Sequence, residues 1–183
     1  GMYKASLHLD STIYDKTFQV LADPRIKANA ADYEKQANLL QNIAGDVNDI
    51  HVSVVRMRNL KKQLAGIIDR IENKEAFKSI VTLADSINTK IDEWEAKLIQ
   101  TKSESNDDVI NFVNKLTANY IFLRGELDTN TPHVTSGHVQ RFKELNDEWR
   151  IYKAELNAIL ENDIKNLNEK CKSLQLSHIL LID

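Results

Sequence analysis

Apolar residues recur at steps of three or four from Tyr33 to Ile71, and no proline interrupts this stretch. A repeat of this length is typical of one face of a long amphipathic α-helix. Asn29 stands three residues before Asp32, which predicts an N-cap followed by an acidic first turn. The whole chain of 183 residues holds only two prolines and five glycines, so it favours long helices over a many-stranded sheet.

The same periodicity predicts three further helices. We expect the four helices at about 30–73, 75–101, 107–128 and 132–175, the last opening on Pro132, which suits a first helical turn. Four amphipathic helices with short links predict an all-α fold, an antiparallel four-helix bundle over residues 28–183. The expected core brings Ile87, Ile91 and Trp94 together with Leu116, Leu145 and Trp149.

The first 27 residues differ from the rest, because apolar and polar residues alternate there. The alternation runs from Tyr3 to Leu9 and again from Tyr14 to Val20, around the polar turn Asp10-Ser11-Thr12. This pattern predicts a short N-terminal β-hairpin within residues 1–27. Asp23-Pro24 ends its second strand.

In an up-down-up-down bundle, the long first and fourth helices would project beyond the second and third. We expect the hairpin and the apolar tail Ile179–Ile182 to cover this overhang, because a hairpin alone is marginally stable in water. Any homodimer would form at the same end. The apolar residues of the overhang would be Tyr33, Ala37 and Leu40 from the first helix and Leu167, Cys171 and Leu174 from the fourth.

Motifs of catalytic, cofactor or metal chemistry are absent from the sequence. It contains no Glu-x-x-His or His-Glu-x-x-His pair, no Gly-rich phosphate loop and no Gly-x-Ser-x-Gly elbow. His133 and His138 are five residues apart, so on a helix they would point to different sides. We therefore expect no enzyme, no cofactor, and no catalytic or metal-binding residues.

Charge and composition give little support for nucleic-acid or membrane partners. The net charge is −3, and the basic cluster Arg56, Arg58, Lys61 and Lys62 has no interleaved aromatic residues. The longest apolar run, Ile179–Ile182, is far shorter than the ~20 residues of a membrane span. The single cysteine, Cys171, lies on an apolar helix face, which predicts a small core residue rather than a reactive thiol.

Several short motifs resemble the C-terminal region of one protein family. The stretch Phe18–Ile26, with its Asp23-Pro24-Arg25 exit, is similar to the strand end that leads into the C-terminal helices of sortilin-like proteins. These are large bacterial proteins with Asp-box (BNR) β-propellers, often labelled glycosyl-hydrolase-like. The chain departs from the family pattern at Val113, where the family tends to carry proline, and at Leu176–Ile179. Further similar stretches are Arg58–Leu64, Leu98–Lys102, Ile110–Phe112, Asn114–Leu116 and the Pro132 opening of the fourth helix.

The resemblance implies a C-terminal helical domain of a larger exported protein, although no signal peptide stands at the start of this chain. Residues 1–27 would be the end of a β-sandwich. Any glycan chemistry would lie in the propeller, whose Ser-x-Asp-x-Gly-x-Thr-Trp signature does not occur here. We expect a non-catalytic structural or protein-interaction module. Its partner would be the propeller or β-sandwich of its parent protein, or a second copy of the chain.

Two alternatives stay open at this point. The chain could be a free-standing interaction protein that lacks the propeller, or part of a glycan-processing enzyme whose active site lies outside it. The natural open reading frame would separate the first alternative from the leading interpretation. Turnover of glycosides would test the second.

Overall fold

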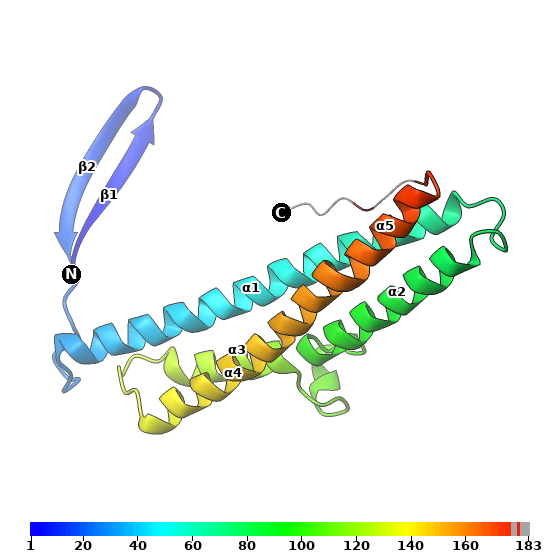
Figure 1. The fold of residues 1–183 in the computed structure, drawn as a ribbon. Helices are drawn as coiled ribbons and strands as arrows, with labels where there is room; N and C mark the ends of the chain where they lie inside the picture. Colours follow the sequence, from blue (N-terminus) through cyan, green and yellow to red (C-terminus); the bar gives the residue numbers. More distant parts are fainter. Residues whose placement is uncertain (177–178, 180–183) are drawn as a thin grey trace.

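The computed structural model describes residues 1–176 and 179, apart from the side chains of Asn106 and Val109, as a mostly helical chain with an N-terminal hairpin (Figure 1). Residues 180–182 of the expected apolar tail lie outside the described residues. The helical class and the antiparallel hairpin predicted from the sequence are confirmed. The strands are β1 (Met2–Leu9) and β2 (Thr12–Gln19), and the helices are α1 (Ala30–Asp69), α2 (Lys78–Leu98), the 3₁₀ turn η1 (Asn106–Val109), α3 (Leu116–Leu127), α4 (Ser136–Ala158), the π-helical η2 (Ile159–Ile164) and α5 (Lys165–Ser173).

The start of α1 is fixed by a capping box. The Asn29 side chain accepts hydrogen bonds from the backbone N–H groups of Ala31 at 2.8 Å and Asp32 at 3.2 Å. The Asp32 carboxylate in turn accepts from the Asn29 backbone N–H at 2.9 Å. These bonds satisfy N–H groups that have no partner within the helix, so the helix begins where the Asn29 and Asp32 spacing predicts.

The predicted third helix, 107–128, is wrong in its first half. Ser105 and Asp108 form a capping box, but the turn that follows is only the short η1, and α3 begins at Leu116. Between them, Ile110 is 86% exposed and Val113 is 79% exposed. Asn residues compete for backbone hydrogen bonds and β-branched residues lose side-chain freedom in a helix, so this Ile-Asn-Phe-Val-Asn segment is a poor helix former.

The fourth helix starts at Ser136 rather than at Pro132. Thr135 is its N-cap, because its hydroxyl accepts from the His138 backbone N–H at 3.2 Å. The His138 ring Nδ1 accepts from the Thr135 backbone N–H at 3.3 Å. Pro132 is buried in the preceding loop. A side chain that can cap the helix therefore decides its start, and the proline does not.

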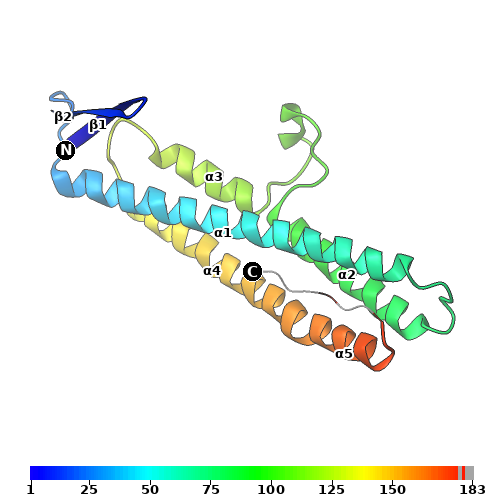
Figure 2. The ribbon, with the colours of Figure 1, turned by 90° about the horizontal axis from the view of Figure 1, so that it is seen from above.

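Polar contacts between helices show that α2 and α3 both run against α1. As residue numbers rise along α1, those of its partners fall. The contacts with α3 involve the first half of α1 and those with α2 the second half, so α3 and α2 lie end to end along it (Figures 1 and 2). The pairs are Gln36–Leu127, Asp46–Tyr120, Arg58–Glu95 and Lys61–Asp92.

The α4 helix runs in the same direction as α1. Here the residue numbers of both partners rise together along the contact. Figure 2 shows α4 and α5 continuing as one long rod beside α1. The pairs are Lys35–Val134, Asp46–Asn146 and Asp49–Lys153.

This arrangement contradicts the predicted antiparallel four-helix bundle, in which α3 would run with α1 and α4 against it. Instead α1, α3 and α4 pack together at one end, whereas at the other end α2 packs between α1 and the η2–α5 segment. Helix lengths explain the difference, because α1 has 40 residues while α2 and α3 have 21 and 12. Only end-to-end placement lets two short helices cover the apolar face of α1 along most of its length.

The expected overhang is therefore wrong as well. The start of α1 lies beside the start of α4, where the Lys35 ammonium donates to the Val134 carbonyl at 3.1 Å. Cys171, on α5, lies at the opposite end, where α5 packs on α2. The start of α1, with Tyr33, and α5, with Cys171, would be neighbours in the up-down-up-down order. Figure 1 instead shows the start of α1 and α5 at opposite ends of the helical body, α1 to α5.

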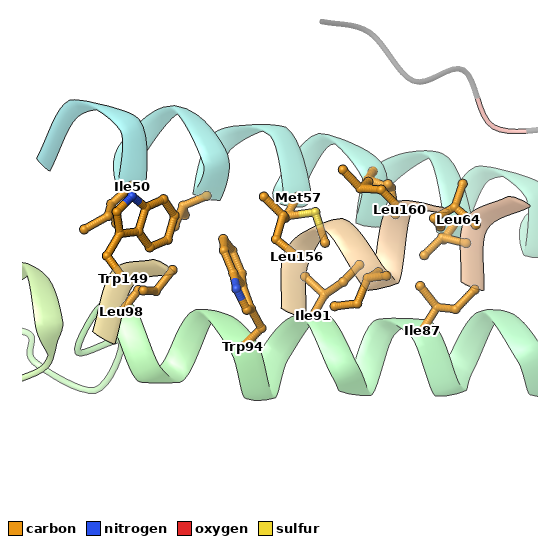
Figure 3. Packing of buried hydrophobic residues seen from close by; sticks show 14 of the residues in the cluster. Ile50, Met57, Leu64, Ile87, Ile91, Trp94, Leu98, Trp149, Leu156 and Leu160 are labelled. Carbon is orange, nitrogen blue, oxygen red and sulfur yellow. The ribbon is translucent and has the colours of Figure 1, made fainter. Parts of the chain in front are cut away.

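One hydrophobic core runs through the helical body, and Figure 3 shows its middle part between α1, α2 and α4. Trp94 and Trp149 are buried there, as the sequence predicts. The Trp94 indole N–H donates to the Tyr152 carbonyl at 2.8 Å, and that of Trp149 donates to the Asp49 carboxylate at 3.1 Å. Both rings thus bury their apolar surface without leaving a donor unpaired. The other residues expected in the core, Ile87, Ile91, Leu116 and Leu145, are also buried.

The hairpin stands apart from the helical body. Among the elements that the structure describes, no helix packs against β1 or β2, and every residue of both strands is exposed. The expected docking of the hairpin on the helices is therefore wrong (Figure 1). The link between the two parts is short and turns sharply at Asp23-Pro24-Arg25.

This turn is held by the Asp23 side chain. Its carboxylate accepts from the Arg25 backbone N–H at 2.9 Å and pairs with the Arg25 guanidinium at 2.6 Å. The side-chain hydrogen bond from Arg25 lowers the pKa of Asp23. The motif that carries the family resemblance is thus a compact turn between hairpin and helices.

Candidate protein-interaction surface

One face of the hairpin is mainly apolar, with Lys16 and Thr12 as its polar members. Strand residues alternate between the two faces of a sheet, and directly opposed residues share a face. The register pairs Tyr3 with Phe18 and Leu7 with Tyr14. The Tyr3 and Phe18 rings stack with their centroids 6.0 Å apart. Together with Leu9, these side chains form what we call the apolar face, and each is between 47% and 64% exposed.

The opposite face is mainly polar. Asp15 accepts hydrogen bonds from the Ser6 hydroxyl at 2.6 Å and from the Lys4 ammonium at 3.1 Å. These two bonds, Ser6 first, lower the pKa of the Asp15 carboxyl. Thr17 and His8 lie on the same face, next to the apolar side chains of Met2 and Ile13 near its ends. The hairpin is therefore amphipathic, with one face suited to water and one suited to burial.

Both outer edges of the hairpin lack a neighbouring strand within the described chain, because the sheet has only the two strands β1 and β2. An edge strand presents unpaired N–H and C=O groups that can pair with another strand. The apolar face and the free edges together make the hairpin the candidate interaction surface of this protein.

Two aspartates of α1 form a polar bridge to α3 and α4, which we call the Asp46–Asp49 bridge. Burial raises the pKa of the Tyr120 phenol, and its hydrogen bond to Asp46 raises that pKa further. The hydrogen-bond donors and acceptors of the bridge come from α1, α3 and α4 and pair with one another. The bridge therefore fixes how these three helices are aligned along their lengths. The bonds are Tyr120 to Asp46 at 2.8 Å, Asn146 to Asp46 at 2.9 Å, Trp149 to Asp49 at 3.1 Å and Lys153 to Asp49 at 2.6 Å.

The basic cluster noted in the sequence is divided between two surfaces. Arg58 and Lys61 pair with the α2 carboxylates Glu95 and Asp92, which offset their charge. Arg56 instead faces the segment formed by η2 and α5. The cluster is therefore not one continuous basic patch.

The remaining residues singled out from the sequence lie in ordinary structural surroundings. Cys171 is fully buried, and burial raises the pKa of its thiol. His138 belongs to the N-cap of α4, whereas His133 is exposed in the loop before it. Within the described part of the chain, no three His, Cys, Asp or Glu side chains form a group that could hold a metal ion.

The structure also contains a concave surface that the sequence did not predict. A groove of about 1000 Å³ lies between α1 and the η2–α5 segment, and we call it the C-terminal groove. Arg56 lines it from α1, Leu160 and Ile164 from η2, and Asn168 and Lys172 from α5. It exists because the backbones of η2 and α5 lie farther from the backbone of α1 than that of α4 does. The sequence has no signal for the π-helical turn at η2. Its periodicity therefore predicts a continuous α-helix here, packed against its neighbours without a groove.

Comparison of this chain with protein-family models, with curated proteins and with solved structures found no match. The resemblance to sortilin-like proteins therefore stays a prediction from the sequence. None of the helices in the described residues is long and apolar enough to cross a membrane.

Proposed function

We propose that this chain is a non-catalytic interaction module, in which the helical body carries the hairpin as the contact with a β-structured protein domain. The observation that carries the proposal is the apolar face. Contiguous apolar patches of this kind on a protein surface mark interaction sites. A two-stranded hairpin is at best marginally stable in water, so a partner covering this face would stabilise it.

A β-structured partner fits the hairpin better than a helix does. A strand added at a free edge would satisfy the backbone groups there and continue the alternation of side chains. A second sheet stacked about 10 Å away would bury the apolar face as one layer of a sandwich. This agrees with the resemblance, in which residues 1–27 end a β-sandwich of a sortilin-like Asp-box propeller protein.

The experiment starts from the natural open reading frame. The proposal predicts β-rich residues encoded before Tyr3 that bind this chain when they are produced as a separate polypeptide. In isothermal titration calorimetry, Tyr14→Lys on the apolar face should abolish binding, because it replaces a large apolar side chain of the contact with a second lysine beside Lys16. Thr17→Lys on the polar face is the matched control and should bind as the parent chain does. Equal loss in both variants, or no binding by the parent chain, would contradict the proposal.

Two other interpretations give different results. A free-standing interaction protein would have a reading frame without a preceding β-domain. A second copy as the partner would double the mass measured by light scattering, and Tyr14→Lys would return it to that of one chain. Hydrolysis of glycosides by this chain alone would overturn its non-catalytic role.

A further inference from the structure

Every second residue of each hairpin strand points its backbone groups outward, away from the other strand. Gly1 and Val20 exchange two hydrogen bonds, from the Gly1 ammonium to the Val20 carbonyl at 2.6 Å and from the Val20 N–H to the Gly1 carbonyl at 2.8 Å. In an antiparallel pair of strands, such hydrogen-bonded pairs alternate with pairs whose N–H and C=O groups point outward. With the observed register, the residues with outward backbone groups are Met2, Lys4, Ser6 and His8 on β1 and Ile13, Asp15, Thr17 and Gln19 on β2.

The two edges of the hairpin differ in the side chains that they place on the apolar face. Along β1 this row consists of Tyr3, Ala5, Leu7 and Leu9, and none of them carries a charge. Along β2 the row is interrupted near its middle by Lys16, directly opposite Ala5. A lysine on an edge strand hinders the pairing of a further strand at that edge. The side chains of β1 therefore suit an added strand better than those of β2.

The charge of Lys16 reaches water most easily while β2 remains an outer edge. Its neighbours on the same face of the hairpin, Ala5, Tyr14 and Phe18, are uncharged. A lysine side chain can cover apolar surface with its methylene groups and still extend its ammonium into water. A strand added at β2 would lie across that path and would bury the ammonium unless it supplied a carboxylate, and burial of an unpaired charge is strongly unfavourable. A strand added at β1 leaves the path open.

The small side chain of Ala5 indicates what an added strand would carry. Ala5 lies between Tyr3 and Leu7 in the row of β1. Side chains of adjacent strands that share a face lie about 5 Å apart, so a large apolar side chain beside Ala5 would fill the space between these two neighbours. At the alternate positions, the added strand would share the polar face with Lys4 and Ser6, and polar side chains suit that face.

We propose that β1, and not β2, is the edge to which the β-structured partner adds a strand. This strand alternates polar residues with apolar residues, and it places a large apolar side chain beside Ala5. The inference rests on the proposed function, because it takes the hairpin as the contact with the partner. In the complex, β1 is an inner strand of the extended sheet, and β2 remains an outer edge that Lys16 protects.

Hydrogen exchange of backbone N–H groups tests the choice of edge without any substitution. NMR would follow the whole chain with and without the polypeptide encoded before Tyr3. In the complex, the N–H groups of Lys4 and Ser6 should exchange at least about tenfold more slowly, because they become hydrogen-bonded. Those of Asp15 and Thr17 should exchange as in the free chain. Binding with slower exchange at Asp15 and Thr17, or at neither edge, would overturn the inference and leave the proposed function standing.

A matched pair of proline variants tests the same edge by calorimetry with the same polypeptide. Proline lacks the N–H group and obstructs an added strand, and at an outward position it removes no backbone bond between β1 and β2. Ser6→Pro and Asp15→Pro both lose the Ser6–Asp15 hydrogen bond, but they block opposite edges. Ser6→Pro should weaken binding at least about tenfold, whereas Asp15→Pro should bind within about threefold of the parent chain.

The outcomes separate this inference from the proposed function. No binding by the parent chain would contradict both. Binding by the parent chain with equal effects of the two prolines, or with the larger effect in Asp15→Pro, would overturn the inference alone. NMR spectra establish whether each variant keeps the hairpin, and the exchange measurement on the parent chain decides the question if one of them does not.

Discussion

The helical body and the hairpin are both amphipathic, but only the helical body covers its own apolar face. Trp94 and Trp149 are 1% and 2% exposed, whereas Tyr14 and Phe18 of the hairpin are 57% and 47% exposed. The two regions follow equally regular sequence patterns. The difference lies in what each face can reach, because the helices meet one another and the hairpin meets none of them.

Polar side chains show the same contrast. In the helical body the Asp46–Asp49 bridge joins α1 to α3 and α4, so its bonds depend on tertiary structure. In the hairpin Asp15 bonds only to Lys4 and Ser6 of the facing strand. Substitutions in the helical body should therefore affect the whole of it, and substitutions in the hairpin should stay local.

The largest expected effect comes from one buried ring compared with one exposed ring. Trp94→Ala should lower the free energy of unfolding by roughly 3–5 kcal/mol, because it leaves a cavity between three helices. Phe18→Ala should change the free energy of unfolding of the helical body by less than about 0.5 kcal/mol, because that ring does not touch the helices. Urea denaturation followed by helical circular dichroism measures both. A similar decrease in the free energy of unfolding in the two variants would contradict the difference between the two regions.

The next comparison concerns two aspartates. Asp46→Ala should lower the free energy of unfolding by about 1–3 kcal/mol, because the Tyr120 hydroxyl and the Asn146 amide lose their acceptor in a partly buried site. Asp15→Ala, on the exposed face of the hairpin, should leave the free energy of unfolding of the helical body unchanged. Chemical denaturation at pH 7 tests the pair, and an Asp46→Ala variant as stable as the parent chain would show that the bridge does not hold the helices.

Alkaline pH should lower the free energy of unfolding of the helical body, because the phenol groups of Tyr120 and Tyr152 lose their protons more readily in the unfolded state. Burial is the main cause that raises the pKa of Tyr120, and it raises that of Tyr152 to about 12. Unfolded phenols ionise near pH 10, so from about pH 10 upward the unfolded state releases protons that the folded state keeps, and stability falls as pH rises. Tyr120→Phe should cost about 0.5–1.5 kcal/mol at pH 7 and should reduce this fall.

Denaturation midpoints between pH 9 and pH 11 measure that effect. Tyr14→Phe in the hairpin is the matched control and should follow the parent chain. An identical pH dependence in the parent chain and in Tyr120→Phe would contradict the role assigned to Tyr120.

Local features of the fold could be predicted from the sequence, whereas the relations between elements could not. The alternation around Asp10 predicts the hairpin, and the Asn29–Asp32 pair predicts the start of α1, because each signal lies within a few residues. The direction of α3 depends on the lengths of α1, α2 and α3, because two short helices cover a long one only when they lie end to end along it. The interpretation of residues 107–128 as one helix made α3 too long, whereas the expected up-down-up-down order placed Tyr33 beside Cys171.

For the candidate site, too, the local features could be predicted from the sequence and the tertiary contacts could not. The residues of the apolar face share that face because strands alternate, and this is visible in the sequence. That the face stays uncovered depends on a tertiary contact that does not form. The C-terminal groove could not be predicted either, because it results from the π-helical turn at Ile159–Ile164 and from the separation of α5 from α1.

The central claim is that the helical body folds without the hairpin, whose apolar face is left for a partner. The most direct measurement is the free energy of unfolding of residues 23–183 compared with that of the whole chain, by urea denaturation under the same conditions. The account predicts equal values within about 0.5 kcal/mol, because no helix packs against the strands. A loss of more than about 1 kcal/mol, or aggregation of the shortened chain, would show that the hairpin covers part of the helical body and would contradict the account.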